Sequence, residues 1–220
     1  IFIMKTPGVL RFLLLTCLIV CGLSLRSQSI SGVINSYYKV TAINTLTNTL
    51  TLPATGGLSP GSKILIIQMK GATITSTNTA SFGDITNINQ AGNYEVNELC
   101  GISGNDIILK YQLLRSYDPA GLVQVVSVPV YNSVTITDTL KAAAWDPVSG
   151  TGGVLVMEAT GTITMNSPID ASGKGFTGGA LRNYSGCVWS TNVTQYSLPI
   201  SPADPNTKKK KKGEGIAEFI

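Results

Sequence analysis

The strict alternation of side chains from Leu155 to Ala171 constrains the fold more than any other feature of this chain. Every second residue from Leu155 is small or apolar, whereas the interleaved residues are almost all polar. Because successive strand side chains point to opposite faces, this period of two predicts strands that place Ile163 and Met165 on a core and Thr162 and Thr164 outside. Glycine and proline interruptions allow the strands to bend. Short bent strands are typical of one coil of a parallel β-helix, although a meander in a sandwich gives the same pattern.

The chain before this stretch also has the signs of an all-β protein. Only 13% of the residues are charged, and Gly, Thr, Ser and Asn replace them, which favours turns and strands over helices. A Thr-, Asn- and Ser-rich stretch from Gly71 to Gly92 is expected to be a long ordered loop. Short strands at this spacing indicate a small β-barrel or sandwich. The expected strands are Tyr37–Ile43, Thr49–Leu52, Lys63–Met69, Tyr94–Leu99, Asp106–Tyr111, Val123–Val130 and Ser133–Leu140. Within Lys63–Met69, the continuous apolar run from Ile64 to Ile67 predicts a strand buried on both faces.

The N-terminal segment predicts export. Lys5 and Arg11 form a positive region, and the apolar stretch from Phe12 to Leu25 is about 14 residues long, too short for the roughly 20 that span a bilayer. We therefore expect a secretory signal peptide that is cleaved near Ser27, a secreted or cell-surface protein, and no membrane span after cleavage. The predicted organisation is a signal peptide at 1–27, a β-barrel or sandwich at 28–145, a β-helix-like or second β layer at 146–196, and a linker with a truncated continuation at 197–220.

The formal charge of +4 does not describe the part expected to fold. Three basic residues lie in the leader and five more form the run Lys208–Lys212, which is expected to be a solvated tether. The remainder carries 8 basic and 12 acidic residues, a net charge of −4. A basic footprint for nucleic acid is absent from it, so we expect no nucleic-acid partner.

Two glycine-rich motifs resemble cofactor loops without the context that such loops need. Gly173–Gly178 spells G-x-G-x-x-G, but no helical pattern follows it, so a glycine turn between coils is the better interpretation. In Gly56–Lys63, Ser62 precedes Lys63, the wrong order for a phosphate loop. No cofactor is predicted.

The sequence also lacks a recognisable catalytic or metal-binding constellation. It contains no histidine, which removes the histidine-based triads and the commonest transition-metal ligand. Acidic residues that could form a glycosidase pair have no spacing that places two on one cleft. Asn105 with Asp106, and Asp84 with Asn87 and Asn89, could offer oxygens to calcium but match no known loop. No catalytic or metal residue is predicted; the acidic candidates considered were Glu95, Glu98, Asp106, Glu158 and Asp170.

Two cysteines remain after removal of the leader. In an exported chain Cys100 and Cys187 could form a disulfide, and closing so long a loop would contribute roughly 4 kcal/mol. Two separate buried thiols are the alternative.

Four segments carry a resemblance to a known class of proteins. They are GSKILIIQMKGA at 61–72, AGNYE at 91–95, the run from Gly152 to Phe176, and KGEGIA at 212–217. Together they resemble the N-terminal region of very large bacterial cell-surface, adhesin-like proteins exported by the type IX secretion route. Such proteins usually continue into a glycine-rich stretch, repeated adhesive domains and a C-terminal sorting domain. The five consecutive lysines depart from this pattern. The resemblance carries no catalytic motif, so it assigns no functional residue.

These observations predict an exported all-β protein: a small β-barrel or sandwich followed by a β-helix-like segment or second sheet. We expect a non-enzymatic, structural or adhesive role, with glycans or other cell-surface material as partners. Two alternatives remain: the non-catalytic front of a secreted polysaccharide-degrading enzyme, and a β-helix lyase.

Overall fold

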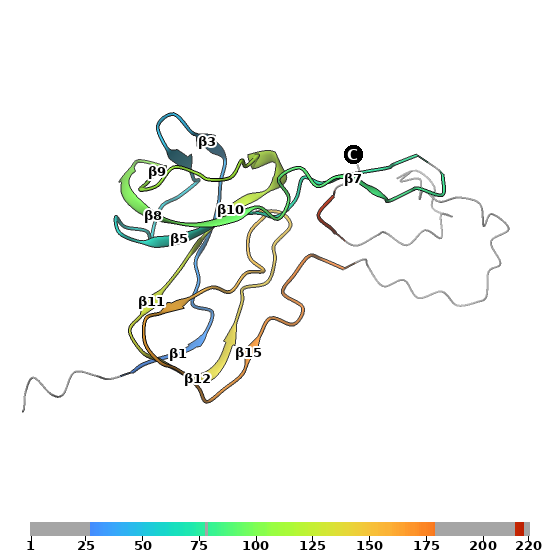
Figure 1. The fold of residues 1–220 in the computed structure, drawn as a ribbon. Helices are drawn as coiled ribbons and strands as arrows, with labels where there is room; N and C mark the ends of the chain where they lie inside the picture. The colour runs from blue at the N-terminus through green and yellow to red at the C-terminus, as the bar shows by residue number, and fades with distance from the viewer. Residues whose placement is uncertain (1–26, 78, 179–213, 218–220) are drawn as a thin grey trace, which may run out of the picture.

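A computed structural model describes residues 27–77, 79–178 and 214–217 (Figure 1). These residues form strands, one short 3₁₀ helix (η1, Pro119–Gly121) and no α-helix, which confirms the all-β prediction. None of the described segments is a helix able to cross a bilayer. The strands are β1 (Gln28–Gly32), β2 (Tyr37–Lys39), β3 (Ala42–Asn44), β4 (Thr49–Thr51), β5 (Lys63–Gln68), β6 (Thr73–Ile74), β7 (Ile85–Asn87), β8 (Tyr94–Ser103), β9 (Asp106–Leu109), β10 (Val123–Ser127), β11 (Val130–Tyr131), β12 (Val134–Lys141), β13 (Glu158–Ala159), β14 (Ile163–Met165) and β15 (Ile169–Asp170).

Seven of these strands form an antiparallel barrel. Their order is β2-β10-β5-β8-β9-β4-β3, so the two ends of the sheet are consecutive parts of one bent segment. At the bend, the Val40 N–H donates to the Val123 carbonyl and the Thr41 N–H donates to the Thr51 carbonyl, both at 2.9 Å. The segment thus pairs with β10 on one side and β4 on the other, and the sheet closes on itself. Closure removes the exposed strand edges that an open sheet would leave.

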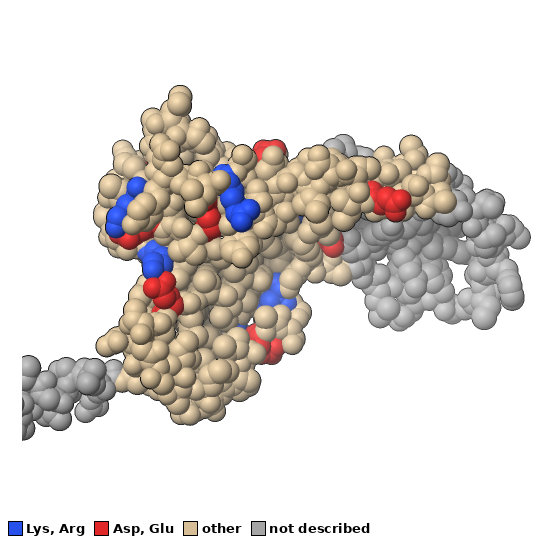
Figure 2. Space-filling model, in the orientation of Figure 1, with Lys and Arg blue, Asp and Glu red and all other residues tan. Residues whose placement is uncertain are grey.

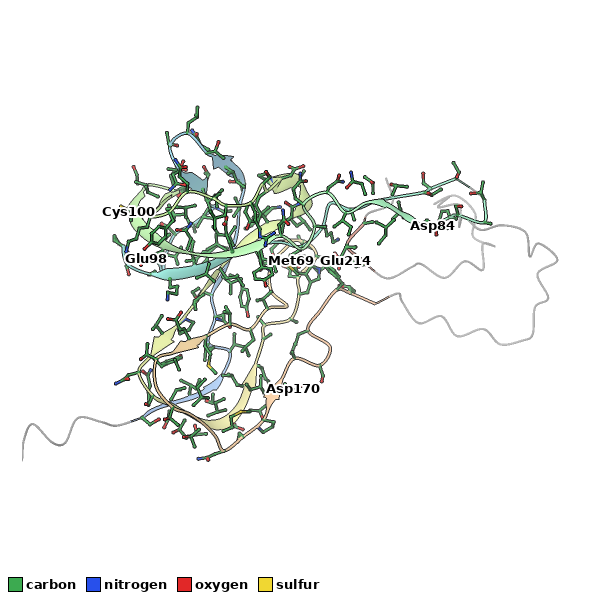
Figure 3. All side chains as sticks on the ribbon, viewed as in Figure 1. Met69, Asp84, Glu98, Cys100, Asp170 and Glu214 are labelled. Carbon is green, nitrogen blue, oxygen red and sulfur yellow. The ribbon has the colours of Figure 1, made fainter. Side chains whose placement is uncertain are left out.

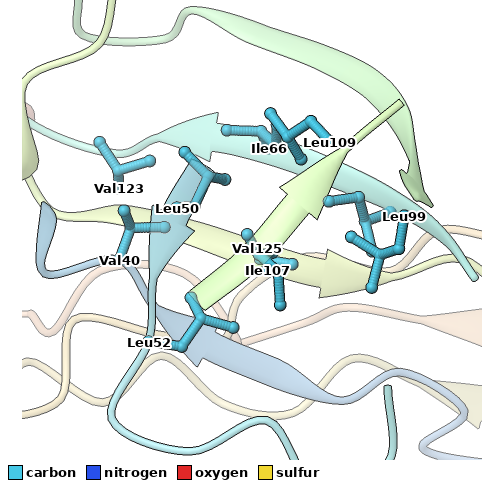
Figure 4. Close-up of a cluster of buried hydrophobic side chains, with 10 residues drawn as sticks. Val40, Leu50, Leu52, Ile66, Leu99, Ile107, Leu109, Val123 and Val125 are labelled. Carbon is cyan, nitrogen blue, oxygen red and sulfur yellow. The ribbon is translucent and has the colours of Figure 1, made fainter. Parts of the chain in front are cut away.

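The barrel core consists of aliphatic side chains that alternate along its strands (Figure 4). In β5, Ile64 and Ile66 point into this core, whereas Leu65 packs on the opposite face with Val154 and Val156. The prediction that this apolar run is buried on both faces is therefore confirmed. The buried members of the core are Val40, Leu50, Leu52, Ile64, Ile66, Leu99, Ile107, Leu109, Val123 and Val125.

Six of the remaining strands stack in parallel, as in a β-helix. β12 pairs in parallel with β1 on one side and with β14 and β15 on the other, and β11 pairs in parallel with β13. Val134 pairs with Ile163 and Leu140 pairs with Ile169, so successive coils are 29 residues apart. A second core lies inside this parallel stack and contains the fully buried Ile136. The predicted β-helix-like segment is confirmed.

The parallel stack begins before the barrel. β1 precedes the barrel in sequence, yet Ile30 pairs with Ile136 of β12, which follows it. The barrel is therefore inserted between two coils (Figure 1). β1, β11 and β12 fall inside the predicted 28–145 barrel region but contribute their hydrogen bonds to the stack.

The outermost described coil corrects one prediction from the alternation. Ile163 and Met165 align with the fully buried Val134 and Ile136, so they do lie on the core side of the strand. They are nevertheless 45% and 60% exposed, because no strand among the described residues covers this side of β14. The prediction that these two side chains are buried is wrong for this reason.

Two polar side chains join the barrel to the parallel stack. Gln124 in β10 is fully buried; its amide donates to the Gly152 carbonyl (3.0 Å) and accepts from the Gly152 N–H (2.9 Å). Asn35 binds the carbonyl and N–H of Val156 and also donates to the Ser127 carbonyl. Among the described residues, the segment that contains Gly152 and Val156 has no neighbouring strand at these points. The two amides bond its backbone N–H and carbonyl groups, which would otherwise be buried without hydrogen bonds.

Candidate functional site

A long hairpin, residues 71–92, projects sideways from the barrel; we call it the arm (Figure 1). It contains β6 and β7, which pair antiparallel, and beyond them the Thr75 N–H donates to the Asp84 carbonyl at 2.9 Å. Most of its described side chains are exposed, including Ile85 (53%) and Ile88 (56%). Its visible surface bears little charge apart from an acidic patch on its outer half, where Asp84 lies (Figures 2 and 3). The predicted ordered loop is therefore a hairpin with a polar, largely uncharged surface.

The root of the arm is held by two side-chain amides, the exposed Asn89 and the buried Gln68. The Asn89 side chain donates to the Gly71 carbonyl at 2.7 Å, joining the two ends of the hairpin. Gln68, only 1% exposed, donates to the Lys70 carbonyl and accepts from the Asp118 N–H, both at 2.8 Å. Gly121 lies against this amide: a Cβ there would come within 2.1 Å of the Gln68 nitrogen. The root is therefore fixed to the barrel although the arm is exposed.

Beside this root lies a cluster of interacting side chains that we call the clasp: Lys70, Trp145, Phe176, Thr177 and Glu214. The Lys70 ammonium contacts one carboxylate oxygen of Glu214 at 2.5 Å. The other oxygen accepts from the Trp145 indole N–H (2.9 Å) and the Thr177 N–H (3.1 Å). The Phe176 ring meets Trp145 edge to face, with 5.2 Å between centroids, and lies under the Lys70 ammonium. Figure 3 labels Glu214 beside Met69, at the junction of barrel and arm.

The ion pair of the clasp is poorly accessible to water. The side chain of Lys70 is 5% exposed and that of Glu214 is 15% exposed. Burial alone would raise the pKa of Glu214, but the bonds from Lys70, the Thr177 N–H and Trp145 outweigh burial and hold this pKa below its usual value of 4.5. The carboxylate therefore remains charged near neutral pH.

The residues that follow Glu214 attach to the arm itself. We call Glu214–Ala217 the strap. The Ile216 carbonyl accepts from the N–H groups of Gly71 (3.0 Å) and Ala72 (3.2 Å), and Ala217 forms a parallel bridge with Ala72. The strap thus connects the root of the arm with the end of the parallel stack.

The acidic residues considered from the sequence take part in separate local bonds. No group of three His, Cys, Asp or Glu in the described ranges could hold a metal ion. Asp84 lies on the exposed arm, as do Asn87 and Asn89. Each of the other five carboxylates accepts from a different partner: Glu95 from the Leu114 N–H, Glu98 from Lys110, Asp106 from Thr51, Glu158 from Lys63 and Asp170 from the Ser172 N–H.

The other sequence candidates have simpler roles in the structure. Gly173 has a positive φ of 66° in a turn, and no helix begins within Gly173–Gly178. This agrees with the glycine-turn interpretation. The Cys100 thiol is exposed, whereas Cys187 lies outside the described residues, so a disulfide between them stays a prediction.

Sequence reasoning did not identify the clasp. Lys70 and Glu214 are 144 positions apart, and neither belongs to a recognisable local motif. The only available signal was the resemblance, because the quoted segments 61–72, Gly152 to Phe176 and 212–217 contain Lys70, Phe176 and Glu214. The structure brings these three segments together at one point.

Comparison with known proteins gives two distant structural similarities. No protein-family profile and no curated protein matches the sequence. The Gp54 tailspike of Acinetobacter baumannii bacteriophage AP22, solved in complex with A. baumannii capsular saccharide, is 11% identical with a TM-score of 0.32; the match covers 70% of this chain and 30% of the tailspike. The tailspike protein gp49 from Pseudomonas phage LKA1 is 15% identical with a TM-score of 0.28, covering 65% and 23%. The chain spans less than a third of either tailspike, and likeness at this level carries no argument about function.

Proposed function

We propose that this chain is the non-catalytic N-terminal part of an exported cell-surface protein with a structural or adhesive role. The observation that carries the proposal is the arm: a polar, projecting hairpin whose root is fixed by buried hydrogen bonds and by the clasp. Such a construction holds an exposed surface at a defined place on a scaffold. We place the protein in the adhesin-like class that its sequence resembles, exported by the type IX route after cleavage near Ser27.

The chemistry of the arm favours a glycan or similar cell-surface material as partner. Hydroxyl and amide groups both donate and accept hydrogen bonds, so they suit a partner rich in hydroxyl groups. The exposed Ile85 and Ile88 add apolar contact area next to these groups. The polar residues offered by the arm are Thr75, Ser76, Thr77, Thr79, Ser81, Thr86, Asn87 and Asn89.

The proposal is tested by shortening the arm. Residues 73–88 are replaced by an Asn-Gly turn, which can join the two ends of the hairpin that the Asn89–Gly71 hydrogen bond holds together. We expect the leaderless protein to bind immobilised cell-surface polysaccharide and the shortened variant to lose this binding. The control variant inserts the same turn in place of residues 45–48, between β3 and β4, and should bind normally.

Four results would contradict the proposal. Equal binding by the shortened variant would show that the arm is not the binding surface, and binding by neither protein would remove the adhesive role. Release of saccharide from the polysaccharide would favour the lyase alternative. N-terminal sequencing of exported protein that still begins at Met4 would contradict cleavage near Ser27.

A further inference from the structure

The outer face of the barrel carries an uncharged strip that begins at the root of the arm. The barrel core takes the even-numbered side chains of β5 and the odd-numbered side chains of β8, so the intervening side chains point outward. β5 and β8 pair antiparallel, which places Ile67 opposite Tyr94 and Leu65 opposite Val96. Met69 continues the outward side of β5 toward the arm. We call these five residues the strip.

The strip is open to solvent along β8 and covered along part of β5. Tyr94 and Val96 are 59% and 53% exposed. Leu65 is only 8% exposed, because it packs against Val154 and Val156 of the segment that leads into the parallel stack. The strip therefore presents an exposed aromatic ring and a valine beside an apolar border that the chain itself provides.

The charges at the far end of the strip are compensated within the chain. Figure 3 labels residues at its two ends, Met69 beside the arm and Glu98 on the other side of the barrel. Glu98 pairs with Lys110 at 2.8 Å, and Lys63, which is opposite Glu98 in the sheet, pairs with Glu158 at 2.6 Å. An ionic ligand would have to compete with these partners. The strip therefore favours a neutral ligand.

The dimensions of the strip suit a narrow chain better than a folded protein. The strand rises about 20 Å from Lys63 to Met69, and two neighbouring strands make a surface about 10 Å wide. The resulting area is about 200 Å², well below the roughly 800 Å² per partner of a stable protein interface. A polysaccharide is long and narrow and can lie along such a surface.

We infer that a neutral polysaccharide bound by the arm continues along the strip and stacks one sugar ring on Tyr94. This inference rests on the proposed function, because the arm supplies the other part of the binding surface, and Tyr94 is the second residue after the end of the arm at Gly92. The face of an aromatic ring is negatively polarised and attracts the partly positive C–H groups on the apolar face of a pyranose ring. The arm then binds the hydroxyl groups of neighbouring sugars.

Substitution of Tyr94 in the leaderless protein tests the inference. The probes are the neutral polysaccharides mannan, xylan and galactan, each immobilised, with the acidic polysaccharide alginate for comparison. We expect Tyr94→Ala to weaken binding to a neutral polysaccharide by about tenfold or more, as loss of an aromatic anchor does. Tyr94→Phe keeps the ring and should bind as the wild type does. Leu46→Ala, at a 96% exposed position between β3 and β4, is the control and should also bind normally.

The outcomes separate this inference from the proposed function. Because Tyr94 is exposed, all three variants should keep the urea midpoint of the wild type, so a loss of binding is not a loss of fold. Wild-type affinity of Tyr94→Ala, together with loss of binding in the shortened-arm variant, would overturn the role of the strip and leave the arm as the binding surface. This is also the result expected if the strip docks a protein.

Three other results would overturn the inference. An equal loss in Tyr94→Phe would show that the hydroxyl group rather than the ring face makes the contact. Binding to alginate alone would contradict a neutral ligand. Absence of binding by the wild type to all four polysaccharides would remove the adhesive role and, with it, the inference that rests on it.

Discussion

Replacement of Gln124 by methionine measures how strongly the barrel and the parallel stack are joined. Gln124 is fully buried, and its amide makes two hydrogen bonds, of 2.9 and 3.0 Å, to the backbone of Gly152. Methionine has a similar size but cannot form either bond. Both the N–H and the carbonyl of Gly152 would then be buried without this partner.

The expected loss follows from these two groups. Leaving one buried polar group without a hydrogen bond costs about 1–3 kcal/mol, so two groups give about 2–6 kcal/mol. A domain has about 5–15 kcal/mol of total stability, and the variant should therefore unfold at a clearly lower urea concentration. The loss is a property of the junction, because Gln124 lies in β10 of the barrel and Gly152 lies on the segment that leads into the stack.

Urea unfolding of the leaderless protein provides the measurement. The matched control is Gln28→Met in β1, where the side chain is exposed and the change should stay within about 0.5 kcal/mol. Midpoints and slopes are compared, because an altered slope would indicate a change in the unfolded or native ensemble rather than in stability alone. A loss below about 1 kcal/mol at Gln124, or equal losses at both positions, would refute the argument that these bonds join the two parts.

Three further predictions follow from the clasp, the stack and its junction. Because the pKa of Glu214 is lowered in the folded state, the carboxylate should stabilise the fold above about pH 4.5 and lose this effect as the pH falls below that value. The difference in unfolding free energy between wild type and Glu214→Gln should therefore shrink between about pH 6 and pH 3. A constant difference would contradict the ion pair. Ile136→Ala should lower the free energy of unfolding by about 2–5 kcal/mol. Met165 pairs with Ile136 but is 60% exposed, so Met165→Ala should cost well under half as much. Equal losses would contradict the open outer coil. Gly152→Ala should lower the free energy of unfolding by about 1–3 kcal/mol or more, because the φ of Gly152 is +101° and the new Cβ would lie 2.3 Å from a backbone oxygen. The control, Gly175→Ala, has open space around the new Cβ and should leave the urea midpoint unchanged.

The sequence by itself determined the class of structure and much of its local geometry. Threonine-rich alternation and sparse charge predicted strands, and the apolar run at 63–69 was correctly interpreted as a strand buried on both faces. The glycine motif at 173–178 was correctly assigned to a turn. These features are local, because backbone preference and the alternation of faces depend on neighbouring residues in the chain.

The tertiary structure alone decided which strands become neighbours. β1 pairs with β12, although the whole barrel lies between them in the sequence. The segment from β2 to β3 closes the barrel by pairing with β10 and β4. The sequences of these strands do not specify such partners. The same limit explains Met165: the alternation identified its face, but its burial depends on whether another strand covers that face. Lys70 and Glu214 form an ion pair although they lie 144 positions apart in the sequence. Partner choice is decided by packing and by the closure of long loops, and these are properties of the complete fold rather than of any segment.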